Sequence, residues 1–195
     1  RRRLERVYAV VGRACLDACV CAPMHFIVQT LSRFPLRALY GMSDAIFFVA
    51  HRMMRWRHDV AASNLRRAFP GMTSPQRGAI LEQSYRNLAD LVVEILWGAA
   101  ASRAQIADRV RVDNPECVND ELRAGRSVLL LTAHFCNWEW QVLAGNLLLD
   151  KPMYAVYKPQ RIAALDRFLH ATRSRFGHAP IPHKALTRFL LNHRR

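Results

Sequence analysis

The sequence predicts an α/β fold, in which helices cover a mostly parallel or mixed sheet. Three short apolar runs in the second half carry this prediction, at residues 128–131, 153–157 and 179–182. Each run is bounded by turn-forming residues and followed by a segment whose apolar residues recur at helical spacing. Strands that alternate with helices in this way favour parallel pairing with both faces of the sheet covered.

The first half of the chain is predicted to be helical. Residues 7–31 form an apolar stretch that is interrupted by Arg13 and Asp17, and a second apolar stretch covers residues 36–50. The first is long enough to cross a bilayer, which takes about 20 residues, but its two charges make it a poor span. We predict that residues 1–50 are a membrane-anchoring helical segment and that residues 51–195 are the catalytic domain. A pair of ordinary core helices is the alternative for residues 1–50.

A cluster of basic residues follows the second apolar stretch directly and consists of Arg52, Arg55, Arg57 and His58. Basic residues at the border of an apolar helix are typical of an anchor at the cytoplasmic face of a membrane. Beyond this cluster, apolar periodicity and turn signals predict helices at residues 59–68, 73–97, 116–124, 161–176 and from 184 onward, with a short helix that passes into a strand at 106–112.

The charge and the cysteines limit the classes of partner and cofactor. Lys and Arg number 29 against 15 Asp and Glu, so the formal net charge is +14. This excess indicates anionic partners, such as phospholipids, phosphorylated substrates, an acidic carrier protein or nucleic acid.

The five cysteines are odd in number and clustered, which is unlike a disulfide framework. Metal ligation would have to come from Cys15, Cys19, Cys21 and His25. These cysteines are better explained as small apolar residues on a buried or lipid-facing helix than as metal ligands.

Residues 127–149 are the centre of the predicted fold, because a strand-like run leads into an amphipathic helix that begins near Asn137. His134 and Glu139 lie at this junction. On one continuous helix, a five-residue spacing would separate them by about 140°. They converge only if His134 lies in a turn and Glu139 lies in the first helical turn, with Asn137 as the N-cap. A carboxylate there can orient the histidine as a general base, although a capping glutamate beside a turn histidine is the simpler interpretation.

Four sequence blocks resemble the lipid A biosynthesis late acyltransferase family. Residues 132–139 (TAHFCNWE) resemble its catalytic block, which has a histidine, a few residues and then Asn-Trp-Glu. Residues 64–70 (NLRRAFP), 154–159 (YAVYKP) and 173–177 (RSRFG) are similar to three further blocks, in the same order and at fitting spacing. The resemblance extends over nearly the whole chain and implies a glycerolipid acyltransferase-like fold.

The resemblance also implies a function and a set of site residues. It implies transfer of a fatty acyl group from acyl carrier protein to a hydroxyl of a lipid A precursor, at the cytoplasmic face of the inner membrane and without a cofactor, metal ion or nucleic acid. His134 is then the base, Glu139 its orienter, and Arg173 a positive group near the acceptor phosphate or the developing oxyanion. Lys158, Asn137 and Arg175 complete the predicted substrate-binding set.

The chain departs from the family pattern at two points. Cys136 occupies a position that is commonly glycine, which crowds the turn after Phe135. The family's later Asp-Gln block and its aromatic-rich stretch would lie beyond Arg195, so the chain is expected to be a fragment that lacks the C-terminal part of the fold.

Three other functions remain open from the sequence. The acceptor could be another glycolipid or a phospholipid. Cys136, beside His134 at the start of a helix, could be the nucleophile of a cysteine enzyme. The basic charge alone would also suit a non-enzymatic module that binds membrane or RNA, although its arginines are scattered and no RNA-binding signature is present.

Overall fold

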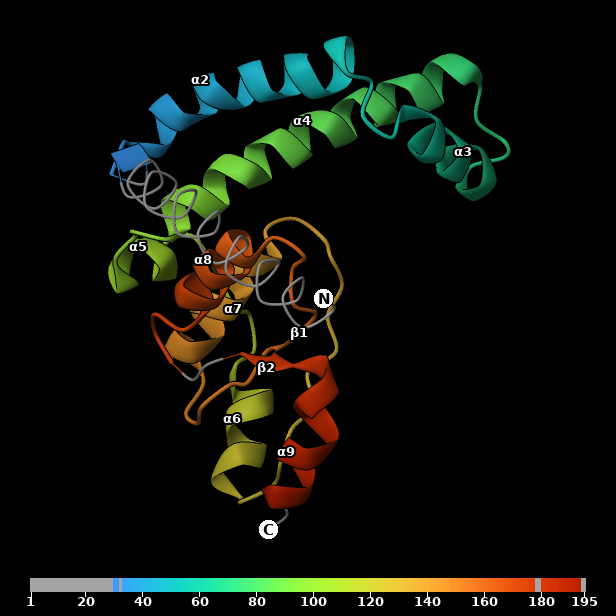
Figure 1. The fold of residues 1–195 in the computed structure, drawn as a ribbon. Helices are drawn as coiled ribbons and strands as arrows, with labels where there is room; N and C mark the ends of the chain where they lie inside the picture. The colour runs from blue at the N-terminus through green and yellow to red at the C-terminus, as the bar shows by residue number, and fades with distance from the viewer. Residues whose placement is uncertain (1–29, 32, 178–179, 194–195) are drawn as a thin grey trace, which may run out of the picture.

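The computed structural model describes residues 30–31, 33–177 and 180–193. The apolar stretch before residue 30, with Cys15, Cys19, Cys21 and His25, lies outside these residues. In order, the elements are α2 (Leu36–Phe47), the π-helix η1 (Phe48–Met53), α3 (His58–Ala68), α4 (Ser74–Gly98), α5 (Arg103–Ala107), α6 (Glu116–Arg123), α7 (Trp138–Leu148), β1 (Val156–Tyr157), α8 (Ala163–Arg173), β2 (Ile181–Pro182), the 3₁₀-helix η2 (His183–Ala185) and α9 (Leu186–Asn192) (Figure 1).

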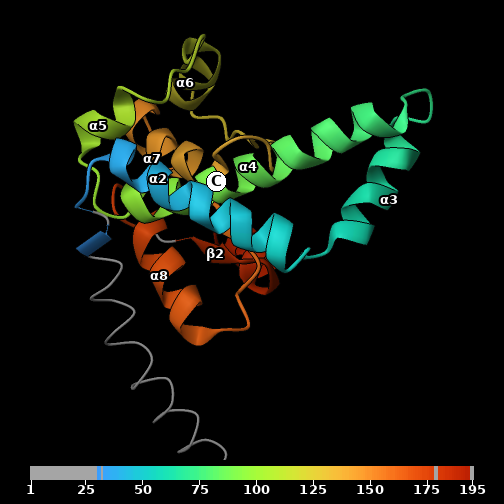
Figure 2. The ribbon, with the colours of Figure 1, turned by 90° about the horizontal axis from the view of Figure 1, so that it is seen from above.

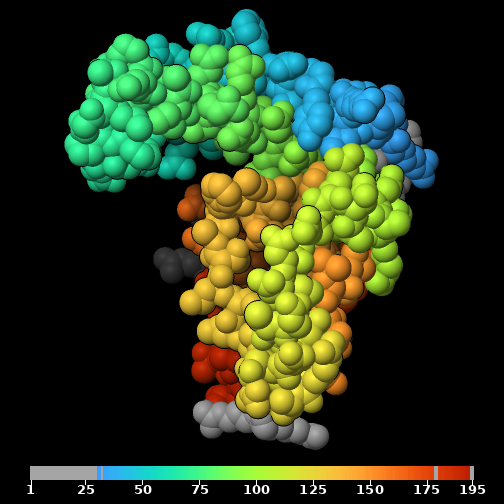
Figure 3. All heavy atoms as spheres, turned by 180° about the vertical axis from the view of Figure 1, so that it is seen from behind, coloured from blue at the N-terminus to red at the C-terminus, as the bar shows by residue number. Residues whose placement is uncertain are grey.

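The described chain is mostly helical, and the 25-residue helix α4 is its longest element. The backbone N–H of Thr73 donates to Gln76 Oε1 at 2.7 Å, as in a capping box, and Pro75 follows within the first turn. Helix α2 lies along α4, and α3 packs against the N-terminal half of α4. These three helices form an arm that projects from the remaining elements (Figures 2 and 3).

The main core lies where the C-terminal half of α4 meets α2, α5 and α7. Its buried members are Leu36, Leu39, Val93, Trp97, Ala101, Ile106, Trp140, Leu143, Ala144 and Phe176. A Cβ on Gly98 would lie 2.9 Å from Trp140 Nε1, so a glycine there allows α7 to approach the end of α4 closely. The start of α7, which carries the predicted site, is therefore fixed against the longest helix of the described chain.

The sheet is smaller than predicted. β1 and β2 pair in parallel, with Val156 opposite Ile181 and Tyr157 opposite Pro182. The parallel pairing is confirmed, but each strand has only two residues. No strand forms at residues 110–112 or 128–131, so these two predictions are wrong.

The run at 128–131 belongs to neither a helix nor a strand, and no strand of the described chain pairs with it. Leu129 and Leu131 are 84% and 89% exposed. An apolar run becomes a buried strand only where neighbouring backbone completes its hydrogen bonds and other side chains cover it. The apolar composition of the run was therefore not sufficient to make it a strand.

The predicted helices at residues 59–68, 73–97 and 116–124 are confirmed as α3, α4 and α6. Helix α2 contributes Leu36 and Leu39 to the main core, while the boundary at residue 50 stays a prediction. Among the described residues, no helix is both long enough and apolar enough to cross a membrane.

Candidate active site at the start of helix α7

The turn that leads into α7 places the predicted residues on either side of the helix start. Asn137 is the N-cap, and its Oδ1 accepts the backbone N–H of Trp140 at 3.0 Å. Glu139 lies in the first helical turn and is buried, whereas His134 lies in the non-helical turn and is exposed. The predicted helix, its N-cap and the placement of His134 outside it are thus confirmed.

Cys136 adopts a left-handed backbone conformation, with φ at +50°. Residues with a Cβ rarely adopt this conformation, and glycine adopts it without steric cost. The turn between His134 and Asn137 therefore requires a conformation that glycine favours. This explains why a cysteine at position 136, where the family commonly has glycine, strains the turn.

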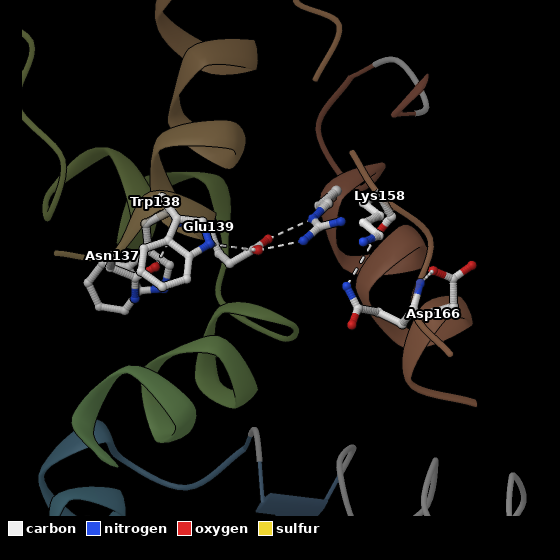
Figure 4. Close-up of polar contacts among 8 residues, drawn as sticks. Asn137, Trp138, Glu139, Lys158 and Asp166 are labelled. Atoms are coloured by element: carbon white, nitrogen blue, oxygen red, sulfur yellow. Dashed lines mark hydrogen bonds and ion pairs between the residues drawn. The ribbon is translucent and has the colours of Figure 1, made fainter. Parts of the chain in front are cut away.

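Glu139 forms a bidentate ion pair with Arg173 of α8. Arg173 Nε donates to Oε2 at 2.7 Å, and Nη2 donates to Oε1 at 2.6 Å, although the two residues are 34 positions apart (Figure 4). The side chains of Arg173 and Glu139 are only 12% and 5% exposed. Charge-assisted pairs of this kind have strong geometric specificity, so the pair fixes α8 against the start of α7.

Two aromatic side chains surround this ion pair. The indole N–H of Trp138 donates to Glu139 Oε1 at 3.2 Å. The guanidinium of Arg173 lies 5.5 Å from the ring centre of Tyr157 in β1, within range of a cation–π contact. The hydrogen bonds to Glu139 raise the pKa of Arg173 above its usual value, so Arg173 stays charged. The third nitrogen of its guanidinium, Nη1, is buried and has no hydrogen-bond partner among the described residues.

His134 contacts Trp138 rather than Glu139. The centres of the His134 and Trp138 rings are 4.7 Å apart. No hydrogen bond joins His134 to Glu139 in the described part of the chain, and the predicted dyad stays a prediction. A carboxylate offers about four lone-pair positions. Among the described residues, Oε1 accepts from Arg173 and Trp138, and Oε2 accepts from Arg173, so three of these positions are filled.

Lys158 and Arg175 occupy different surroundings. Lys158 is exposed just after β1, and its carbonyl accepts from Gln160 Nε2 at 3.3 Å (Figure 4). Arg175 Nη1 donates to the carbonyl of Gly98 at 2.7 Å, which links the end of α8 to the last residue of α4. Burial lowers the pKa of Arg175. The structure thus brings Glu139, Arg173 and Asn137 together, and it uses Arg175 to hold two helix ends in contact.

Comparison with known proteins gives the same family as the sequence blocks. The family model described as bacterial lipid A biosynthesis acyltransferase matches residues 22–195. The chain belongs to this family.

A lipid A biosynthesis acyltransferase of Haemophilus influenzae is 25% identical over 156 residues, which cover 78% of this chain and 48% of the relative. The chain therefore spans about half the length of the curated relative that it matches. No solved structure matches it significantly.

Sequence reasoning missed three residues that shape this acyltransferase-family site. The sequence analysis included Trp138 only as a member of the block at residues 132–139, and Tyr157 only as a member of the block at residues 154–159. Glu94 of α4 was not singled out, although its Oε2 accepts from Asn137 Nδ2 at 2.8 Å. A single carboxylate among the apolar residues 91–97 (LVVEILW) was the available signal, because such a charge usually has a specific partner. No group of three potential metal ligands occurs among the described residues.

We expect Cys136→Gly to raise the free energy of unfolding by about 0.5–1 kcal/mol. Relief of the left-handed strain gains about 1–2 kcal/mol, and the greater backbone entropy of glycine offsets part of that gain. Cys117→Gly is the matched control, because Cys117 is an exposed cysteine inside α6. The same change there should lower stability by about 0.3 kcal/mol. Denaturant unfolding of the purified full-length protein measures both values, and equal effects would contradict the strain at Cys136.

Proposed function

We propose that this chain is the catalytic part of an acyltransferase that moves a fatty acyl group from acyl carrier protein to a hydroxyl of a lipid A precursor. The observation that carries the proposal is the buried Glu139–Arg173 ion pair. Trp138 links it to His134, which lies with Glu139 in the block most similar to the family's catalytic block. A histidine at a helix start next to a fixed carboxylate and a cation has the three functional groups that acyl transfer to an alcohol requires.

His134 is the proposed general base. Its imidazole takes the proton of the acceptor hydroxyl as the oxygen attacks the thioester carbonyl. The tetrahedral intermediate then collapses: the carbon–sulfur bond breaks, and the proton passes from His134 to the leaving thiolate. The products are the ester and the free thiol of the carrier protein. The exposed position of His134 suits this role, because two large substrates must both reach the imidazole.

Arg173 is the proposed positive group. Two of its nitrogens neutralise Glu139, and Nη1 retains a donor for an acceptor phosphate or for the oxyanion of the intermediate. The first backbone N–H groups of α7 add partial positive charge at the same end of the helix. We propose Glu139 as the orienter of both neighbours, Arg173, which is already bound to it, and the His134 ring.

The charge of the chain suits the proposed partners. A net charge of +14 complements an acidic carrier protein, a phosphorylated glycolipid and the anionic surface of a membrane.

We call residues 48–57, between α2 and α3, the elbow. Phe48, Met53, Met54 and Trp56 of the elbow are all at least half exposed, and Arg52 lies among them. Apolar and aromatic side chains mixed with arginines are typical of a surface that contacts the membrane interface, so we propose that the elbow lies on the cytoplasmic face of the inner membrane.

We predict that His134→Ala and Glu139→Ala in the full-length protein each lower acyl transfer by about 10²–10⁴-fold, the usual contribution of a general base. Transfer is measured with acyl carrier protein carrying the acyl group and a lipid A precursor, with mass spectrometry of the product. His134→Ala should keep the wild-type melting temperature, since the ring is exposed. Glu139→Ala should also lower it, because Arg173 would lose its buried partner. Near-normal turnover of His134→Ala would contradict the proposed base.

We predict that Arg173→Lys lowers transfer at least about tenfold, because an ammonium cannot replace a bidentate guanidinium. Arg175→Lys is the matched control, because Arg175 is a nearby, partly buried arginine that binds the Gly98 carbonyl rather than Glu139. That variant should lose stability and keep most of its turnover when measured below its melting temperature. Equal turnover losses in the two variants would show that Arg173 has no special part in the reaction.

We predict that the full-length protein stays on membranes through a 1 M salt wash and is released by detergent. Electrostatic attachment fades in such a wash, because the Debye length falls from about 10 Å at 0.1 M to about 3 Å at 1 M salt. A shortened protein without residues 1–29 keeps Leu36 and Leu39 in the core and relies on the elbow, so salt should release it in part.

The contribution of the elbow is tested in the shortened protein. Met53→Ser, Met54→Ser and Trp56→Ser combined should allow complete release by salt. Leu190→Ser combined with Leu191→Ser, at similarly exposed positions in α9, is the control and should change nothing. Release of the full-length protein by 1 M salt alone would refute the anchor.

A further inference from the structure

Glu94 connects the arm of the protein to the start of α7. Its Oε2 accepts from Asn137 Nδ2 at 2.8 Å, and its Oε1 accepts from the hydroxyl of Tyr40 in α2 at 2.8 Å. The backbone carbonyl of Glu94 also accepts the indole N–H of Trp140 at 3.1 Å. One residue of α4 therefore contacts both the N-cap of α7 and the first turn that follows it.

The carboxylate of Glu94 determines which way the Asn137 amide faces. Oδ1 of Asn137 must face the N–H of Trp140 to cap the helix, which leaves Nδ2 to face Glu94. If the amide were reversed, Nδ2 would meet the N–H of Trp140, and Oδ1 would meet the carboxylate. Both contacts would be repulsive, because a carboxylate accepts hydrogen bonds and cannot donate them.

We propose that Glu94 is a positioning residue for acyl transfer: it fixes the Asn137 amide, and through it the turn that carries His134 and Glu139. This inference rests on the proposed function for its activity readout. Glu139 follows Asn137 by two residues and must meet Arg173 in a bidentate geometry. A displaced N-cap shifts that carboxylate, and a shift of about 1 Å in a catalytic group can lower the rate by about 10²-fold. Asn137 then acts by capping rather than by contact with substrate.

The hydroxyl of Tyr40 completes the environment of Glu94. Burial and the hydrogen bond to Glu94 raise the pKa of Tyr40 to about 12, so its hydroxyl keeps its proton and remains a donor at neutral pH. Glu94 thus receives one donor on each oxygen. A glutamine at position 94 can keep both contacts, because its amide oxygen can accept from Asn137 and its N–H₂ can donate to the Tyr40 hydroxyl, which also accepts hydrogen bonds. A leucine there accepts from neither donor, so it removes both hydrogen bonds.

The test exchanges donor and acceptor across the contact in the full-length protein. Glu94→Leu should lower kcat about 10–100-fold with little change in KM, because it acts on alignment rather than on substrate affinity. Glu94→Gln should stay within about fivefold of wild type, because its amide oxygen can still accept from Asn137. Asn137→Asp should lower kcat as Glu94→Leu does, since two carboxylates would face each other. The double variant Glu94→Gln with Asn137→Asp should recover to within about fivefold of wild type, because the new amide at position 94 can donate to the new carboxylate at position 137. That carboxylate still caps Trp140, and the amide oxygen at position 94 still accepts from Tyr40.

Tyr40→Phe is the matched control, because it removes the other hydrogen bond to Glu94 without touching Asn137. It should lower the melting temperature and leave kcat within about twofold of wild type. Recovery of the double variant would show that the contact between positions 94 and 137 carries the effect. A double variant as slow as Asn137→Asp alone, or an unchanged kcat in Glu94→Leu, would overturn the inference.

Hydrogen–deuterium exchange of residues 132–140 provides a readout that does not need activity. Exchange there should rise in Glu94→Leu and in Asn137→Asp, and it should return to the wild-type level in the double variant. If wild-type protein transfers no acyl group but exchange follows this pattern, the proposed function fails and the positioning role stands. If exchange is the same in all variants, the positioning role fails whatever the activity shows.

Discussion

The buried ion pair between Glu139 and Arg173 is the interaction on which the site depends. Removing both charges from water costs several kcal/mol per ion, and only a close, well-aligned contact recovers that cost. The bidentate geometry supplies this contact, and Trp138 and Tyr157 add a hydrogen bond and a cation–π contact around it. Because neither partner is stable there alone, α7 and α8 must be placed correctly together. The packing of these two helices therefore determines the position of the turn that carries His134 and Glu139.

Helix α4 is the support against which both helices are placed. Trp97 and Val93 join the core that holds Trp140 and Leu143 of α7, and the carbonyl of Gly98 accepts from Arg175 just after α8. Glu94 adds polar contacts within the same stretch of α4. Apolar packing has no preferred direction, whereas hydrogen bonds fix orientation. The combination explains how α7 can be held in both position and rotation by one face of one helix.

The sequence predicted the local features of the site better than its long-range contacts. The N-cap at Asn137, the helical position of Glu139 and the non-helical position of His134 follow from rules that act over a few residues, and the structure agrees. The partner of Glu139 lies 34 residues away, and no local rule links it to Arg173. The strand at 128–131 failed for the same reason: its apolar composition was evident, but a strand needs a neighbour, and the described chain provides none.

The turn from His134 to Glu139 separates two requirements that conflict in one environment. The proposed base must be accessible to two large substrates, and a carboxylate that holds a guanidinium is most effective where water is scarce. His134 is exposed and Glu139 is buried, although they are five residues apart. The backbone is left-handed at Cys136 between them, and the Asn137 cap fixes where the helix begins. A regular helix or strand through these residues could not expose one side chain and bury the other while both contact the same residue. Trp138 is that residue: its ring lies against the ring of His134, and its indole N–H donates to Glu139.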